Sequence, residues 1–308
     1  MRFSGVSEIV GTIILLAIVL IAGVTIYAYV MNQGNIVSGG ANVQLSVVSL
    51  SAVPGGAGLL SLSVVNAGSV PLSSVAVSLS TGGSTVFSTG TASGSSWASV
   101  FGGSAWHSQG ATPYTATVSV SPGLYQVIAD WVNTGGPGMS AITYSGAEAA
   151  SQGWQTSASA TFYSSYSQVA ANPLNPQGFG TVMATGALPT AEFDYGTPNS
   201  YQGNTYLGLL CQPFPTPFTA LNNFDGYPTE YGYTAFTYMV FTSSVTFNIE
   251  TDDEMAVFYQ AAVVSSGQAL PLSLVIPSGV LSGTTYNVVV AVSSVQGSAV
   301  VSQQVVAQ

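Results

Sequence analysis

The feature that most constrains this chain is an uncharged apolar run near its N-terminus, from Ile9 to Met31. As a helix, such a run is long enough to cross the roughly 30 Å hydrocarbon core of a bilayer. It is too long for the apolar core of a secretory signal peptide, and no A-x-A-like cleavage site follows it. We therefore expect residues 6–33 to form one α-helix that lies in a membrane or packs against other copies of the chain.

Charge is scarce and unevenly distributed. The 308 residues include 11 acidic residues and a single basic one, Arg2, so that only 4% of the chain is charged. No charged residue lies between Glu8 and Asp130, and none follows Glu254. A charged middle between two neutral flanks indicates one domain inserted into another. A nucleic acid is excluded as a partner, because only Arg2 could neutralise a phosphate.

The residues after the apolar run are typical of β-structure. Segments 42–87 and 261–308 alternate apolar and polar residues, with turns at PGG and NAGS. Together they predict about seven short strands, enough for an immunoglobulin-like β-sandwich head. The middle, residues 88–260, is also β in character but rich in aromatics and glycine. The predicted fold class is therefore mainly β, with a long N-terminal α-helix, an immunoglobulin-like sandwich and an inserted second β-sandwich.

The first residues, "MRFSGVSEIVGTIILLAIV", resemble the N-terminal segment of archaeal type IV pilins and archaellins. This resemblance implies that residues 1–5 form a class III leader and that residues 6–33 assemble a helical homopolymer. It also implies insertion in the membrane before assembly and an extracellular, cell-surface filament afterwards. The residues that carry the resemblance are Gly5 and Val6, which flank the leader cleavage position, and Glu8, Gly11 and Gly23 in the assembly helix.

The middle segment resembles the β-sandwich lectin domain of anthrax protective antigen and yeast flocculins. Three stretches carry this resemblance: "FDYGTP" at 193–198, "TAFTYMVFTSSVTFNIETDDEMAVFY" at 234–259 and "GLYQVIADWVNTGG" at 123–136. The last of these corresponds to the end of the family's domain but precedes its start here. The resemblance therefore implies an inserted domain that is circularly permuted, which is plausible where chain termini lie close together.

The lectin resemblance implies a calcium site. In flocculin-like members two adjacent aspartates and a loop asparagine hold Ca²⁺, and these fall here on Asp252, Asp253 and Asn133. Carboxylate, amide and carbonyl oxygens are the ligands that Ca²⁺ prefers, and sugar hydroxyls would fill its open positions. The ligand-binding residues that the resemblance implies are Trp131, Gly135, Gly136 and Glu254. Glu254 stands where the family has glycine, and it either adds a ligand or blocks the sugar. The alternative is that these acids are ordinary solvated loop residues.

Other residues receive simpler interpretations. His107 is expected in a loop or core, and the lone Cys211 is expected to be a small buried hydrophobe. Glu192 and Asp194 could join the aspartate pair as the acid and base of a glycosidase, but a surface turn is the simpler expectation. We therefore do not expect an enzyme.

These observations predict the structural subunit of an archaeal type IV pilus-like filament, with an adhesive insert that binds glycans through calcium. One alternative is a purely structural subunit whose insert shields the filament and binds nothing. The other is a membrane-anchored enzyme that hydrolyses glycans. Binding of glycans would separate the first two, and a visible filament would eliminate the third as the main role.

Overall fold

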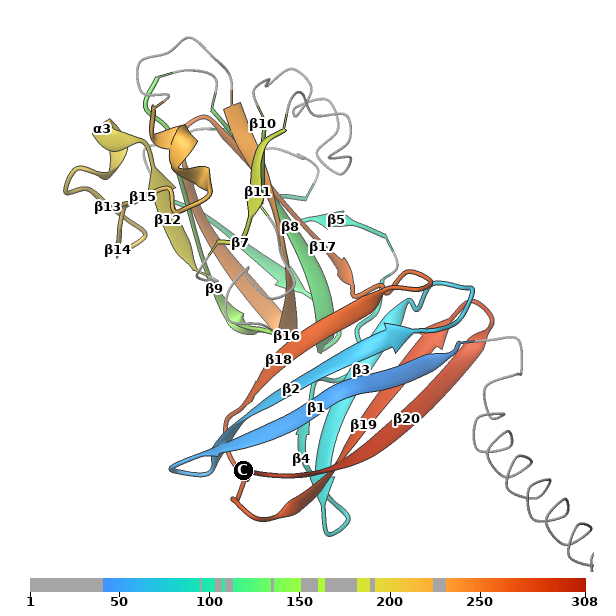
Figure 1. The fold of residues 1–308 in the computed structure, drawn as a ribbon. Helices are drawn as coiled ribbons and strands as arrows, with labels where there is room; N and C mark the ends of the chain where they lie inside the picture. The colour runs from blue at the N-terminus through green and yellow to red at the C-terminus, as the bar shows by residue number, and fades with distance from the viewer. Residues whose placement is uncertain are drawn as a thin grey trace, which may run out of the picture.

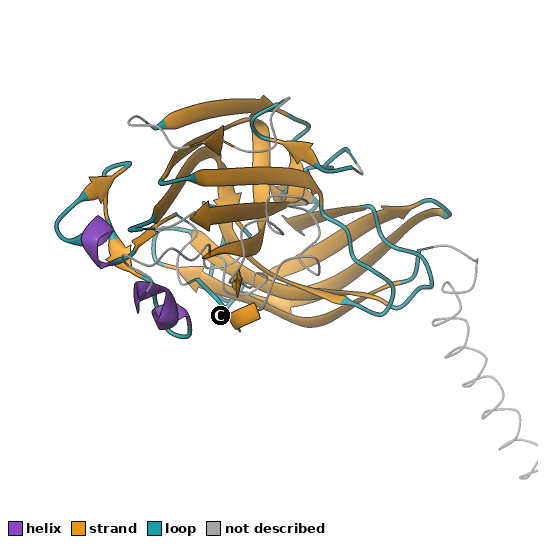
Figure 2. Cartoon of the chain, turned by 90° about the horizontal axis from the view of Figure 1, so that it is seen from above, coloured by secondary structure: helices purple, strands orange, loops and turns teal. Residues whose placement is uncertain are grey.

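The computed structural model describes residues 41–94, 96–102, 107–108, 113–133, 136–150, 160–163, 182–188, 192–223 and 231–308. Strands make up most of these residues, and the helical segments are two short turns (Figure 2). These are α3, Pro198–Tyr201, and the 3₁₀ helix η3, Phe218–Asn223. Within the described ranges, no helix has both the length and the apolar character that a membrane crossing requires.

The predicted fold class is wrong. We expected a long helix ahead of two β-sandwiches, but the described residues are β-structure in several sheets without any long helix. The expected assembly helix, residues 6–33, lies outside the described residues. The middle of the chain is also not a second pair of separate sheets, because its strands join into one continuous 11-stranded sheet.

The head consists of two sheets, which lie below the rest of the molecule in Figure 1. The three-stranded sheet has the order β1-β2-β18 and the four-stranded sheet the order β20-β19-β3-β4. Their bounds are β1 Val43–Val53, β2 Ala57–Asn66, β3 Ser74–Thr81, β4 Ser84–Ser88, β18 Ala269–Ile276, β19 Thr285–Ser294 and β20 Gly297–Val306.

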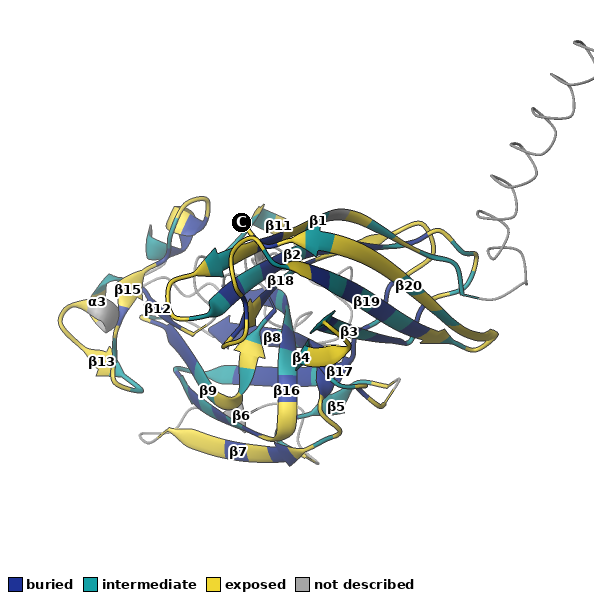
Figure 3. Cartoon of the chain, turned by 90° about the horizontal axis from the view of Figure 1, so that it is seen from below, coloured by how far each residue is buried: buried dark blue, intermediate teal, exposed yellow. Residues whose placement is uncertain are grey.

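One apolar core joins the two head sheets. Along β2 the residues alternate between buried and partly buried, as expected for a strand with one face on a core (Figure 3). Leu60 and Leu274 from one sheet and Val77 and Val290 from the other belong to the same core cluster. The buried Tyr286 fastens the loop before β19, since its hydroxyl accepts from Leu281 N at 2.8 Å and donates to Gly279 O at 2.9 Å.

The chain leaves the head after β4 and returns to it before β18. We call the residues between these two points, 89–262, the insert. Leu72 and Val264 form an antiparallel bridge where the chain returns, with N–O distances of 2.9 and 3.0 Å. The side chain of Asn66, which is fully buried, donates to Val70 O at 2.8 Å and to Val264 O at 2.9 Å. Asn66 thus ties a turn of the head to the returning chain.

The path through the insert sheet is β15-β12-β9-β16-β8-β17-β5, with β6, β7, β10 and β11 attached beside it. Their bounds are β5 Ala98–Ser99, β6 His107–Ser108, β7 Tyr114–Ser119, β8 Gly123–Asn133, β9 Met139–Ala149, β10 Ala160–Tyr163, β11 Val182–Gly186, β12 Phe193–Gly196, β15 Gln212–Pro213, β16 Tyr231–Thr251 and β17 Glu254–Ala261. A separate hairpin joins β13, Thr205–Tyr206, to β14, Leu209–Leu210.

The long strand β16 explains why the insert is one sheet. Its residues 231–241 pair with β8, and its residues 244–249 pair with β7. Strand β9 pairs with residues 239–241 and 246–251 of β16, with a register shift between Phe241 and Thr246. The exposed Thr242 lies at this shift, and its single hydroxyl proton has two acceptors within reach, Gly146 O at 2.8 Å and Ser244 O at 2.9 Å. Both halves contribute to a single core cluster, so the sheet curls around that core.

Candidate functional site

The turn between β16 and β17 holds the two predicted metal ligands, Asp252 and Asp253. Asp252 N donates to Met139 O at 2.9 Å, and Trp131 Nε1 donates to Asp252 O at 3.1 Å. Asp253 has φ +67°, in the left-handed region that favours glycine. The turn is therefore fastened to the core through the backbone of Asp252, while both side chains are only partly covered.

Asn133 ends β8 at the same edge of the sheet. Its neighbour Val132 pairs with Glu254, the first residue of β17, so the end of β8 lies beside the Asp252–Asp253 turn. The amide of Asn133 is fully buried, and its Nδ2 donates to Gly136 O at 2.9 Å and to the hydroxyl of Tyr231. The structure thus brings together two segments that are more than a hundred residues apart in sequence, but the asparagine amide bonds to the protein itself.

The donors at this edge fit calcium only in part. Ca²⁺ takes six to eight oxygen ligands, and the side chains at this edge that carry such oxygens are Asn133, Asp252, Asp253 and Glu254. The hydrogen bonds that Asn133 Nδ2 donates hold its buried amide in place. Among the described residues, no group of three or more His, Cys, Asp or Glu side chains is arranged to hold a metal ion. The predicted calcium requirement stays a prediction.

The predicted sugar-binding residues have different positions. Trp131 is fully buried, and its ring lies 5.7 Å from Phe214 and 5.5 Å from Tyr233, measured between centroids. It presents no face to solvent, so the prediction that it stacks on a sugar does not agree with its position. Gly136 has φ +81° with open space around it, and Glu254 is partly exposed. Gly135 lies outside the described residues, as do Gly5, Val6, Glu8, Gly11 and Gly23.

Two carboxylates hold the β13–β14 hairpin against the sheet. Asp194 Oδ2 accepts from Tyr206 N at 3.3 Å, and Glu250 Oε2 accepts from Leu207 N at 3.2 Å. The pKa of Asp194 is raised to about 7, chiefly by burial and to a smaller extent by the neighbouring Glu250 carboxylate, against the lowering effect of hydrogen bonds from Cys211 and Tyr206. Burial also raises the pKa of the Cys211 thiol, which stays protonated. Asp194 is therefore a buried, partly protonated anchor rather than the residue of a surface turn.

Asp130 is a buried carboxyl that the sequence analysis did not single out. It lies on β8 with no exposed surface, and neither of its oxygens has a hydrogen-bond partner in the described part of the chain. Burial raises its pKa well above the ordinary value, against a smaller lowering effect of Thr234, and therefore favours the neutral form of the carboxyl. An acid within the apolar strand "GLYQVIADWV" was the available signal.

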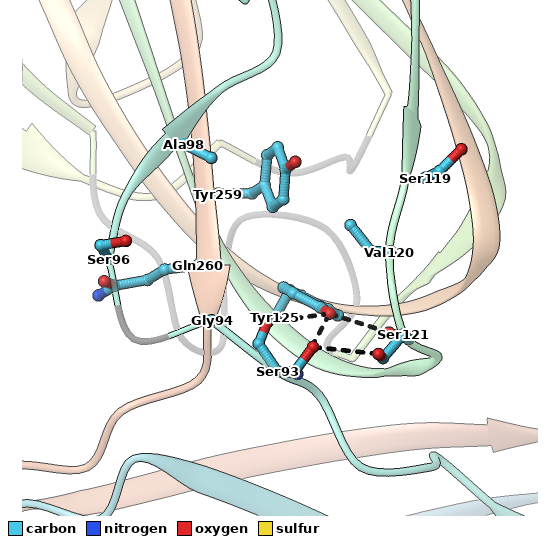
Figure 4. Close-up of a pocket in the computed structure, with 10 residues that line it drawn as sticks. All are labelled: Ser93, Gly94, Ser96, Ala98, Ser119, Val120, Ser121, Tyr125, Tyr259 and Gln260. Atoms are coloured by element: carbon cyan, nitrogen blue, oxygen red, sulfur yellow. Dashed lines mark hydrogen bonds between the residues drawn. The ribbon is translucent and has the colours of Figure 1, made fainter.

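A hydroxyl-lined pocket of about 550 Å³ was also missed (Figure 4). It lies where the insert meets the loop after β4, between Ser93 and Tyr259. Tyr125 OH donates to Ser121 O at 2.9 Å, and the hydroxyls of Ser93 and Ser121 are 3.0 Å apart. Isolated serines in loops carry no sequence pattern, so only the folded chain reveals this grouping.

The fold and these sites were compared with known proteins. The chain matches no protein-family model, no curated protein and no solved structure. The resemblances to pilins and to the lectin domain therefore stay hypotheses.

Proposed function

We propose that this chain is a subunit of an extracellular type IV pilus-like filament whose insert binds surface glycans. The apolar run Ile9–Met31 supports the filament, because an uncharged surface of this length is buried either by lipid or by copies of itself. In this proposal the chain is held in the membrane before assembly, and residues 1–5 are removed as the polymer forms.

The observation that carries the adhesive role is the meeting of the β8 end with the β16–β17 turn. Local sequence gives no reason for Asn133 and Asp252 to approach each other, whereas the lectin resemblance requires it. The pairing of Val132 with Glu254 and the 3.1 Å bond from Trp131 to Asp252 bring both segments to one edge of the sheet. This edge presents the partly exposed carboxylates and the open glycine Gly136.

A glycan array tests this function directly. The purified full-length chain is applied to immobilised glycans in calcium and again in EDTA. We expect binding that the double variant Asp252→Asn, Asp253→Asn weakens by more than roughly tenfold, because a hard-cation site loses both of its side-chain charges. Glu148→Gln, which removes a carboxylate far along β9, is the matched control. Equal binding by both variants would remove the proposal for this edge.

One observation favours the alternative of a shielding insert. Trp131, a predicted ligand-binding residue, and Asn133, a predicted metal ligand, are both fully buried and make internal contacts. A chain that polymerises but binds no glycan in the array would establish this alternative.

A further inference from the structure

A second cavity lies at the junction of the insert and the head. Tyr238, Gln126 and Gln260 stand directly opposite one another on the adjacent strands β16, β8 and β17. Trp97 and the residues at the start of β18 complete the enclosure, whose volume is about 420 Å³. This volume lies within the range of small-molecule sites.

Two amide side chains line this cavity. Gln126 is 6% exposed and Gln260 is 9% exposed. Within the described ranges neither side chain forms a hydrogen bond with the protein, and neither is among the fully buried polar groups without a partner, so both amides are available to a ligand in the cavity. Gln260 and Tyr259 lie on opposite sides of β17 in Figure 4, and Gln260 also lines the hydroxyl-lined pocket.

The side chains that line the cavity also indicate whether its ligand is charged or neutral. Tyr238 and the partly buried Trp97 provide aromatic surface, and Gln126, Gln260 and Gln268 provide amide donors and acceptors. Among the described residues, no charged side chain lines the cavity. An ionic ligand would therefore lose its hydration without gaining a counter-charge there, whereas a ligand with neutral hydroxyls can form hydrogen bonds with both amides.

We propose that this cavity binds a neutral carbohydrate of one or two sugar units. Paired donors and acceptors on neighbouring glutamines suit adjacent hydroxyls, and an aromatic face suits the apolar face of a sugar ring. The cavity is separate from the Asp252–Asp253 edge, because Gln126 and Asn133 are seven residues apart on β8, or about 23 Å. It contains no acidic residue, so its binding does not depend on calcium or on the proposed function of that edge.

The test is calorimetric titration of the full-length chain in EDTA. The probes are glucose, galactose, mannose, N-acetylglucosamine, maltose and chitobiose, with glucuronic acid as the charged comparison. We expect at least one neutral probe to bind, and Gln126→Leu and Gln260→Leu each to weaken it by about fivefold or more, because each removes hydrogen bonds at nearly constant volume. Gln303→Leu, at an exposed position on β20, should leave the affinity unchanged.

Thermal melting shows whether a variant that loses binding is still stably folded. Leucine at position 126 or 260 should leave the melting temperature nearly unchanged, because within the described ranges the lost amide forms no hydrogen bond with the protein. A loss of several degrees would show that the amides stabilise the fold internally, and this would overturn the proposal. Failure of every neutral probe to bind, or equal affinity in wild type and both variants, would also overturn it.

The sugar could belong to another cell or to a neighbouring copy of this serine- and threonine-rich chain. Enzymatic removal of O-linked sugars before titration separates these sources. A binding capacity that increases after removal assigns the cavity to sugars carried by the chain's own copies, and an unchanged capacity assigns it to external glycans. With either source of sugar, Gln126→Leu and Gln260→Leu should weaken the binding.

Discussion

The stability of this protein should fall as the pH rises from about 4 to about 7.5, and Asp194 is one cause. Its pKa is raised from 3.8 to about 7, chiefly by burial. The folded state therefore holds a proton that the unfolded chain releases near pH 4. Since the folded state binds more protons in this window, the free energy of unfolding decreases with pH until the folded carboxyl also ionises near pH 7.

The magnitude follows from the size of the shift. Three pKa units at about 1.36 kcal/mol each give an upper bound of about 4 kcal/mol. The neighbouring hairpin residue Tyr206 is partly exposed, and water near it screens the buried charge, so we expect about 2 kcal/mol from Asp194. Asp130, whose pKa is also raised by burial, contributes in the same direction. The described residues contain no Lys or Arg, so no such ion pair is lost in acid to oppose the trend.

The assay is equilibrium unfolding in urea at pH 4, 5.5 and 7.5, followed by tryptophan fluorescence. Asp194→Asn cannot ionise, so its free energy of unfolding should fall by about 2 kcal/mol less than that of the wild type across this range. Glu192→Gln, which alters an exposed carboxylate two residues away, should follow the wild type. Stability that rises toward pH 7.5, or equal pH slopes for wild type and Asp194→Asn, would refute the reasoning.

Three further substitutions test the packing, each by urea unfolding at pH 4. Tyr286→Phe should lower the free energy of unfolding by about 1–3 kcal/mol, because Leu281 N and Gly279 O lose their partner, whereas Tyr114→Phe on the surface should change it little. Asn66→Ala should cost about 3 kcal/mol, since three hydrogen bonds at the head–insert junction are lost, and a cost below about 1 kcal/mol would contradict this role. Gly232→Ala should cost about 2 kcal/mol or more, because the added Cβ would lie 2.1 Å from Trp131 O, and wild-type stability would show that the strands adjust freely.

The alternation of apolar and polar residues predicted that these segments are strands, but it did not predict which strands pair with each other. The head strands follow a period of two, and β2 and β18 bury alternate residues over their whole length. In the insert, "TSS" at 242–244 has the composition of a turn, yet it is a bend within the single strand β16. Local sequence does not show that the chain stays extended here, because the residues that pair with it, such as Ala147 and Ser119, are about a hundred residues away.

The candidate site could be predicted from the sequence only in part, because it too depends on contacts between residues far apart in the chain. The meeting of Asn133 with the aspartate turn was predicted from a resemblance, and the structure places both at one edge. The burial of Trp131 was not predicted, because tryptophan suits a sugar face and a core equally well by composition. The unpartnered amides of Gln126 and Gln260 depend on strand register across β8 and β17, which no local pattern specifies.

Cryo-electron microscopy of the assembled full-length chain tests the central claim most directly. The account predicts a helical filament with the apolar run 9–31 of every copy at the axis and the insert facing solvent. Leu20→Lys, which places a charge within that run, should prevent assembly, because an unpaired buried charge is expensive. A chain that stays monomeric or singly anchored in membranes, or a polymer with the insert at its axis, would contradict the account.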